Sequence, residues 1–177
     1  VPAILHAWFP GEFCGQAVAE ALFGDYNPGG RLAVTFPKSV GQIPFAFPFK
    51  PGSDVPASTS VYGALYPFGY GLSYTTFEYG KPTADSKTMQ ADGTLTVKVS
   101  VKNTGAREGQ EVVQLYISDK KSSLPRPVKE LKGFQKVKLA PGETKEVTFT
   151  IDKEALSFFD DTQHAWVTEP GKFEAVI

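Results

Sequence analysis

Residues 94–102 alternate between apolar and polar side chains, and this pattern constrains the fold more than any other feature of the sequence. Leu95, Val97, Val99 and Val101 fall on one side of an extended chain, with threonine, lysine and serine on the other. Because successive side chains of a β-strand point to opposite faces, the pattern predicts a strand with one face in a core and one in water. Such half-buried strands are typical of antiparallel sheets.

Further short strands are expected at regular intervals, with turn signals between them. Gly133 shifts the alternation between Leu131 and Phe134, which indicates a β-bulge. Ala140-Pro141-Gly142-Glu143 suits a type II turn, because proline and glycine occupy its two central positions. About seven such strands predict an immunoglobulin-like β-sandwich. The expected strands cover residues 77–79, 94–102, 111–118, 131–139, 146–151, 165–168 and 172–177.

The first 75 residues differ from the rest in composition. They hold 14 of the 23 aromatic residues and 9 of the 14 prolines, but only three basic and four acidic side chains. The other 15 basic and 15 acidic residues all lie in residues 76–177. This shift predicts a domain boundary near residue 75.

Residues 1–36 have the pattern of a single β-α-β unit. Residues 1–8 and 31–36 are expected as strands, and residues 15–23 carry apolar side chains at helical spacing. Gly24 is a natural end for the helix, because glycine accepts the left-handed conformation without a Cβ clash.

One β-α-β unit is too small to bury its own strands and helix. We therefore expect its apolar side chains to be less buried than those of the sandwich. The comparison is between Ile4, Val18, Leu22 and Val34 on one side and Val99 and Phe149 on the other.

Residues 37–74 have neither the period of a strand nor that of a helix, and they are rich in aromatic residues and prolines. A structureless loop of this length is uncommon inside a compact domain, and disordered linkers usually contain few aromatic residues. We therefore expect an ordered connector that lies against a surface, much of it outside these 177 residues.

Motifs along nearly the whole chain resemble the C-terminal region of family 3 glycoside hydrolases, and they follow the order of that family. Cys14 departs from the pattern, since the family more often has glycine or another small residue there. The matching motifs are Trp8-Phe9-Pro10-Gly11, Leu22-Phe23-Gly24-Asp25-Tyr26-Asn27-Pro28-Gly29-Gly30-Arg31-Leu32, Thr35-Phe36-Pro37-Lys38-Ser39-Val40-Gly41-Gln42-Ile43-Pro44, Tyr66-Pro67-Phe68-Gly69-Tyr70-Gly71-Leu72-Ser73-Tyr74-Thr75-Thr76-Phe77, Val101-Lys102-Asn103-Thr104-Gly105, residues 111–117, Arg126-Pro127-Val128-Lys129-Glu130-Leu131-Lys132-Gly133-Phe134, and Glu169-Pro170-Gly171 with Phe173.

The resemblance implies a mainly β fold in three parts. Residues 1–36 would be the C-terminal remnant of an α/β glycosidase domain, residues 37–75 an aromatic connector, and residues 76–177 a fibronectin type III-like β-sandwich. The parent protein would be a retaining, β-glucosidase-like hydrolase of β-linked glucosides, xylosides or related sugars. Such enzymes place two catalytic carboxyl groups about 5–5.5 Å apart.

In that family the nucleophilic aspartate belongs to an N-terminal barrel, and the acid/base glutamate to a segment upstream of residue 1. No residue of this chain inherits either role, so we expect the chain alone to be inactive and to serve as a structural brace. The implied partners are the barrel, the rest of the α/β domain and a β-linked oligosaccharide or glucoside. The resemblance also implies a periplasmic or extracellular location.

Three aromatic residues of the connector, Tyr62, Tyr66 and Phe68, are the candidates for the border of a substrate cleft, with interdomain packing as the alternative. No cofactor or metal is expected. Asp160 and Asp161 have no histidine or third carboxylate nearby in sequence to form a metal site, so they are expected in an exposed turn.

Five other side chains are given structural roles. Glu12 precedes a helix and Asp25 lies in a turn, where carboxylates are common for reasons of local structure. His6 is expected in a core, and Trp8 and Trp166 are expected to pack rather than to stack on a sugar.

The net charge of −1 gives no reason to expect binding to nucleic acid or to an anionic membrane. Two other functions remain open: a non-catalytic carbohydrate- or protein-binding β-sandwich, and an adhesion-type sandwich. A row of exposed aromatic residues on one sheet face would favour the binding module, whereas the predicted outward positions hold threonine, lysine, glutamate and serine. That pattern favours the brace.

Overall fold

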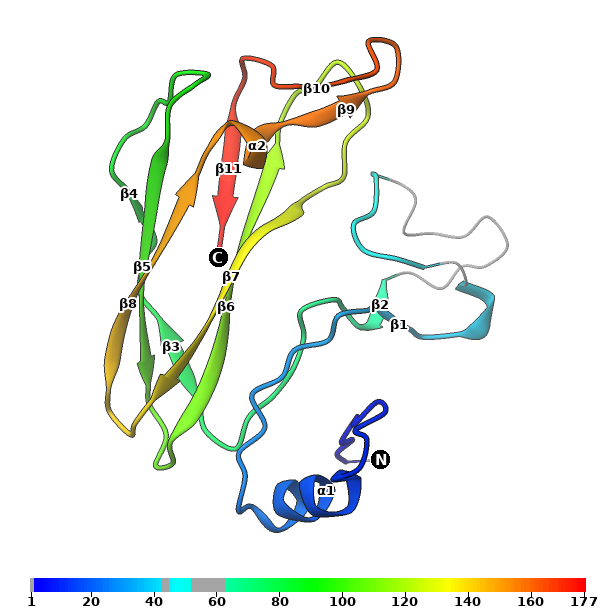
Figure 1. Ribbon diagram of the computed structural model, residues 1–177, viewed down its shortest axis with the longest axis vertical. Coiled ribbons are helices and arrows are strands. Elements are labelled where there is room, and N and C mark those ends of the chain that lie inside the picture. Colours follow the sequence, from blue (N-terminus) through cyan, green and yellow to red (C-terminus); the bar gives the residue numbers. More distant parts are fainter. Residues whose placement is uncertain (1, 43–44, 52–62) are drawn as a thin grey trace.

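In the computed structural model, which describes residues 2–42, 45–51 and 63–177, the predicted strand of alternating residues lies within a four-stranded antiparallel sheet (Figure 1). It is β5 (Leu95–Asn103), and β8 (Thr144–Ile151) pairs along most of its length. β3 (Phe77–Tyr79) and β4 (Thr83–Ala84) pair with its two ends. The turn before β8 has the expected form, because Gly142 has φ = +77° and Glu143 N–H donates to the Ala140 carbonyl.

The second sheet contains three antiparallel strands in the order β11 (Phe173–Val176), β6 (Gly109–Asp119) and β7 (Glu130–Leu139). Leu115 pairs with Gly133 and Tyr116 with Leu131, so β7 carries one extra residue. The predicted bulge at this point is confirmed. A Cβ at Gly133 would lie 3.2 Å from the ring of Phe149, which explains why a glycine faces the other sheet here.

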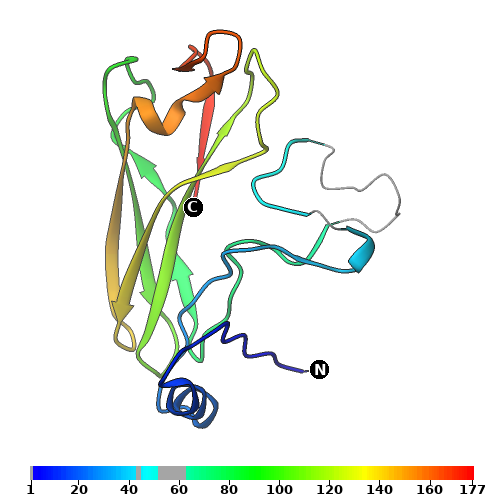
Figure 2. The same ribbon diagram turned by 45° about the vertical axis from the view of Figure 1, so that its right-hand side comes forward.

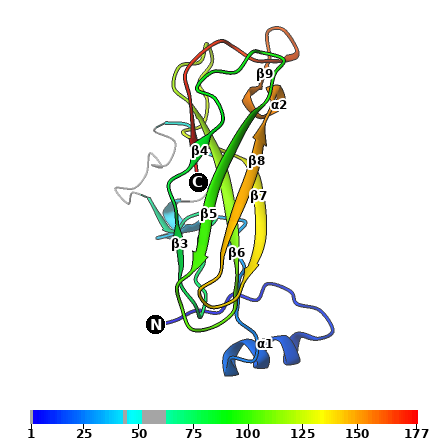
Figure 3. The same ribbon diagram turned by 90° about the vertical axis from the view of Figure 1, so that its left-hand side faces the viewer.

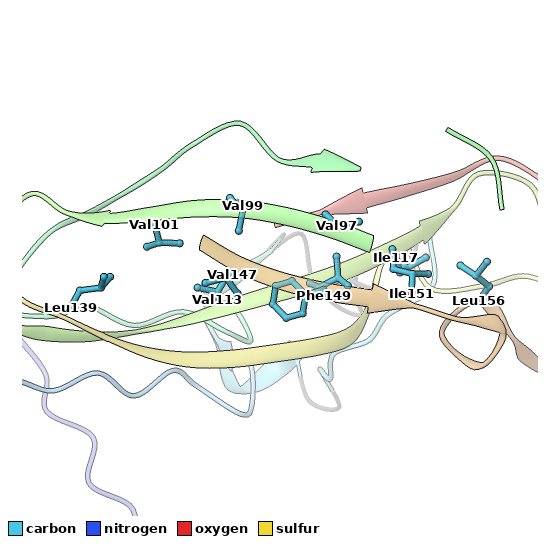
Figure 4. Close-up of a cluster of buried hydrophobic side chains, with 11 residues drawn as sticks. Val97, Val99, Val101, Val113, Ile117, Leu139, Val147, Phe149, Ile151 and Leu156 are labelled. Atoms are coloured by element: carbon cyan, nitrogen blue, oxygen red, sulfur yellow. The ribbon is translucent and has the colours of Figure 1, made fainter. Parts of the chain in front are cut away.

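The hydrophobic core lies between the two sheets (Figure 4). The inward side of β5 is buried as the alternation predicts, and every second residue from Val147 to Ile151 of β8 is buried too. Each fully buried valine or leucine contributes about 1.5–3 kcal/mol relative to an exposed one. The buried cluster consists of Val97, Val99, Val101, Val113, Leu115, Ile117, Leu139, Val147, Phe149, Ile151 and Leu156.

One end of the sandwich carries a short helix and a hairpin. Helix α2 (Lys153–Leu156) begins at Asp152, whose carboxylate accepts from Ala155 N–H at 2.9 Å. The hairpin pairs β9 (Phe158–Asp160) with β10 (Ala165–Val167). The sequence predicted the second of these strands but not the first.

The N-terminal part contains helix α1 (Cys14–Phe23), close to the predicted bounds, and Gly24 ends it with φ = +85°. The two flanking strands of the predicted β-α-β unit are wrong, since residues 2–10 contain no strand and only β1 (Phe36–Pro37) forms near the second. A strand exists only where a neighbour accepts and donates its backbone hydrogen bonds. β1 finds that neighbour in β2 (Ala64–Tyr66), and the 3₁₀ helix η1 (Val40–Gln42) follows it.

Apolar side chains of this part are far more exposed than those of the sandwich, as predicted. Ile4 and Leu22 are 65% and 63% exposed, whereas Val99 is 2% exposed. Val34 is also exposed, Val18 is half-buried, and Phe149 is buried. Figure 2 shows α1 standing clear of the sandwich at its lower end.

Among the residues that the structure describes, no helix is both long enough and apolar enough to span a bilayer.

Candidate functional site: the junction between the sandwich and the N-terminal segment

A network of polar contacts lies where the N-terminal segment meets the sandwich. We call this region the junction. It comprises residues 21–31 and 69–75 of the N-terminal segment and residues 76–79 and 103–116 of the sandwich. Two stretches of the N-terminal segment reach it side by side (Figures 1 and 2), since Leu32 N–H donates to the Tyr70 carbonyl and Gly69 N–H to the Leu32 carbonyl.

Asn27 connects three segments at the junction. Its amide nitrogen donates to the carbonyl of Glu108 at 2.8 Å, which ties it to the sandwich. Its amide oxygen accepts from the Ser73 hydroxyl and from Tyr74 N–H, both at 2.8 Å. An asparagine side chain offers both donors and an acceptor, so one residue can hold all three segments in register.

The C-terminal end of α1 is completed by side chains from outside the helix. The Arg107 guanidinium donates to the Gly24 carbonyl and lies 5.8 Å from the centre of the Tyr74 ring. The Tyr74 hydroxyl donates to the carbonyl of Ala21 at 2.8 Å. The last carbonyls of a helix lack partners within it, and a cation is favoured there by the helix dipole. The sandwich and connector therefore stabilise the end of α1.

Two glycines allow the backbones at the junction to approach. A Cβ at Gly29 would lie 2.6 Å from the carbonyl oxygen of Gln110, and one at Gly71 would overlap the carbonyl oxygen of Gly30. Real side chains do not tolerate such distances to backbone atoms. Gly29 of the Asn27-Pro28-Gly29-Gly30-Arg31 motif and Gly71 of the Tyr70-Gly71 motif are thus explained by packing at the junction.

A buried ion pair joins Arg31 to Glu111 of β6, and their side chains are 12% and 8% exposed. The Tyr79 hydroxyl donates to the other carboxylate oxygen of Glu111 at 2.8 Å. Burial, and after it the hydrogen bond to this carboxylate, raises the pKa of Tyr79 above its usual value. With both oxygens engaged, Glu111 holds the N-terminal segment to the sandwich and is unsuited to act as a general acid.

The predicted cleft residues Tyr66 and Phe68 lie in aromatic clusters of the connector. Tyr66 stacks on Tyr70 with ring centres 5.3 Å apart, and Phe68 stacks on Phe47 at 4.5 Å. Phe47 in turn meets the Tyr116 ring of β6 edge-on. Tyr62 lies outside the described residues. The role of these residues at a substrate cleft therefore stays a prediction.

Two surface hollows flank the junction and the far end of β6. One, of about 360 Å³, is lined by Arg31, Tyr70, Tyr79 and Glu111 among others. The other, of about 670 Å³, lies between residues 50–51 and residues 119–126. Neither Tyr66 nor Phe68 is among the residues that line these two hollows.

The structure corrects the expected environment of several side chains. His6 is exposed and contacts the rings of Trp8 and Phe36, so it is not a core residue. Trp8 and Trp166 are also largely exposed.

The carboxylates have the expected structural surroundings, with one difference in burial. Glu12 and Asp25 are exposed. Asp161 is exposed, whereas Asp160 is buried and its carboxylate accepts from the backbone N–H groups of Thr162 and Gln163. The described residues include no group of three metal-ligating side chains.

Sequence comparison finds two family profiles that together cover most of the chain. Residues 1–74 match the glycosyl hydrolase family 3 C-terminal domain, and residues 111–177 match the fibronectin type III-like domain.

Among curated proteins, a periplasmic beta-glucosidase of Salmonella typhimurium is 50% identical over 99% of this chain and 24% of its own length. A beta-xylosidase of Formosa agariphila is 44% identical over 98% of this chain and 24% of its own length. The chain thus spans about a quarter of the relatives that it matches.

Solved structures give the same result. A β-glucosidase from Erythrobacter marinus is 47% identical and superimposes with a TM-score of 0.92, over 98% of this chain and 23% of that one. A beta-glucosidase from Listeria innocua in complex with glucose is 38% identical with a TM-score of 0.85, over 96% of this chain and 25% of that one.

Proposed function

The chain belongs to glycosyl hydrolase family 3, of which it carries the C-terminal region, and we propose that it is the structural brace of a retaining β-glycosidase. The activity of the whole protein is inferred from its relatives, which are named as β-glucosidases and β-xylosidases. In such enzymes one carboxyl group is the nucleophile and another the acid/base. We assign neither to this chain, which on its own is expected to be inactive.

The observation that carries the proposal is the junction. Asn27, Arg31 and the end of α1 lie in the part that matches the hydrolase C-terminal domain, and each is bonded to the sandwich. Because these bonds involve three separate points, they fix both the distance and the orientation of this segment relative to the sandwich. A sandwich held in this way can position the end of a catalytic domain without contacting the substrate.

The exposed apolar side chains of the N-terminal part support the proposal that further domains cover them. Exposed apolar patches on soluble proteins often mark surfaces that contact other domains or proteins. We propose the barrel and the rest of the α/β domain as its partners, a β-linked glucoside, xyloside or oligosaccharide as substrate, and a periplasmic or extracellular location. The exposed side chains are Ile4, Trp8, Phe9, Phe13, Leu22 and Phe23.

A chimera tests this function directly. The C-terminal region of the Salmonella relative is replaced by this chain, and hydrolysis of aryl β-glucosides and aryl β-xylosides is measured. We expect an active chimera, and no turnover by the 177-residue chain alone.

One test variant and one control variant make the experiment specific. R31A in the chimera is expected to lower activity or thermal stability, whereas K98A, at an exposed ion pair of the sandwich, is expected to leave both unchanged. A folded but inactive chimera, or turnover by the chain alone, would contradict the proposal.

A further inference from the structure

The outer face of the β9–β10 hairpin presents two aromatic side chains to solvent. Trp166 is 69% exposed and Phe159 is 49% exposed. The two residues are directly opposite each other in the ladder, and their rings meet edge to face at 5.9 Å. Cross-strand aromatic pairs of this geometry hold both rings in fixed orientations. We call Phe159 and Trp166 the aromatic pair.

The hairpin beneath the pair is anchored to the sandwich by a buried arginine. Phe158, on the inner face of β9, lies 5.3 Å from the Arg126 guanidinium. Arg126 is itself ion-paired with Asp119 at 3.1 Å and with Glu130 at 3.0 Å, and it donates to the Leu156 carbonyl at 3.0 Å. The hairpin that carries the aromatic pair is therefore held to the sandwich by Arg126 and its partners.

The position of the pair separates it from the surface that the other domains are proposed to cover. In all three ribbon views the hairpin and α1 lie at opposite ends of the sandwich (Figures 1, 2 and 3). The exposed apolar side chains that we propose the other domains cover lie within residues 4–23, at the α1 end. Docking of further domains at that end does not explain an exposed tryptophan here.

The size of the pair distinguishes between classes of ligand. Two side chains of this kind expose at most about 300 Å². A stable protein interface buries about 800 Å² on each partner, so the pair is too small to hold a second protein by itself. A single pyranose ring, by contrast, is about the size of one indole.

The loop beside the pair supplies polar groups suited to a sugar. Residues 161–164 are all exposed and carry a carboxylate, a hydroxyl, an amide and an imidazole. Sugars of β-1,4-linked chains are flat, with C–H groups on their faces and hydroxyls at their edges. An aromatic face bordered by hydrogen-bonding groups is complementary to that arrangement.

We propose that the aromatic pair and the loop at residues 161–164 form a secondary binding site for β-linked pyranose chains, outside the catalytic centre. The choice of sugar rests on the proposed function, but the site belongs to this chain alone. It would hold a neighbouring part of a polymeric substrate near the enzyme.

Fluorescence of single-tryptophan variants tests the site, because the chain contains only Trp8 and Trp166. In the W8F chain, titration with cellohexaose or xylohexaose is expected to change the emission of Trp166 to saturation. In the W166A chain, the emission of Trp8 is expected to stay constant. Maltohexaose, whose α-linked chain is curved, is the control ligand and is expected to bind more weakly.

Affinities measured by calorimetry complete the test. W166A is expected to weaken binding about tenfold or more, W166F to retain most of it, and W8F to leave it unchanged. Thermal melts establish that each variant is folded.

Three results would overturn the proposal: no saturable binding by the unsubstituted chain, equal binding by folded W166A, or equal binding of maltohexaose. Sedimentation velocity tests the alternative that the aromatic pair is an interface between copies of the chain. If the chain self-associates and W166A makes it monomeric without any sugar effect, the pair is an interface between copies. An active chimera together with any of these results would leave the proposed bracing function standing.

Discussion

Arg31 and Glu111 form a buried ion pair although 80 positions separate them in the sequence. Arg31 follows the glycine turn after α1, and Glu111 lies on the sandwich strand β6. The pair therefore reports whether the two parts of the chain are correctly docked.

Replacement of Arg31 by alanine is expected to leave Glu111 buried without its counter-charge. Breaking a buried pair in this way costs about 3–5 kcal/mol of the free energy of unfolding. K98A removes the exposed Lys98–Glu146 pair and is expected to leave the free energy of unfolding nearly unchanged, because solvent screens exposed charges. Urea unfolding of both variants checks this, and equal losses would show that the junction pair has no special role.

Replacement of Gly29 by alanine is expected to destabilise the junction by about 1–3 kcal/mol, because the new Cβ would lie 2.6 Å from the Gln110 carbonyl oxygen. Its neighbour Gly30 is the matched control. A Cβ there meets nothing within 4 Å, so G30A is expected to change stability by less than about 0.5 kcal/mol. Thermal melts measure both, and a G29A chain as stable as G30A would contradict the close approach.

The sandwich could be predicted from the sequence because its signals are local. The alternation along β5 and β8, the glycine bulge in β7 and the proline-glycine turn each extend over a few neighbouring residues. In β5 and β8, the buried side chains are then those at every second position. The same reasoning predicted helix α1 and its end at Gly24.

The junction could not be predicted in this way, because its partners are distant in sequence. Asn27 and Arg31 fall within a motif that the family resemblance had singled out, yet their partners Glu108 and Glu111 lie about 80 residues later. The predicted strands of residues 1–8 and 31–36 failed for a related reason. An apolar run does not make a strand without a neighbour to share its hydrogen bonds.

Alkaline pH is expected to weaken the junction through Tyr79. Partial burial of the phenol, and after it the hydrogen bond to Glu111, raises the pKa of Tyr79 above 10.0 in the folded protein. In the unfolded chain this tyrosine ionises near pH 10. The folded state therefore keeps a proton that the unfolded state loses, and stability falls as pH rises above about 10.

The Y79F variant tests this linkage. It is expected to be less stable than the parent chain at neutral pH, since it lacks the hydrogen bond, but to lose less stability between neutral and alkaline pH. Melting temperatures at a series of pH values provide the measurement. An equally steep alkaline loss in Y79F would assign the effect to other groups.

Residues 76–177 are expected to fold cooperatively without the first 75 residues, and we propose this boundary for the domain. All members of the buried core cluster lie between Val97 and Leu156, so truncation removes none of them. The truncated domain is expected to melt at a lower temperature than the whole chain, because Glu111 and Gln114 of β6 lose their contacts with Arg31 and Gly69.

Residues 1–75 alone are expected to show little helix, because isolated helices shorter than about 12–15 residues are marginal in water and α1 has 10. Calorimetry of residues 76–177 and circular dichroism of residues 1–75 check the two halves of this prediction. A broad, non-cooperative melt of residues 76–177 would contradict the proposed domain boundary. A stable helix in residues 1–75 alone would show that the sandwich is not needed to complete α1.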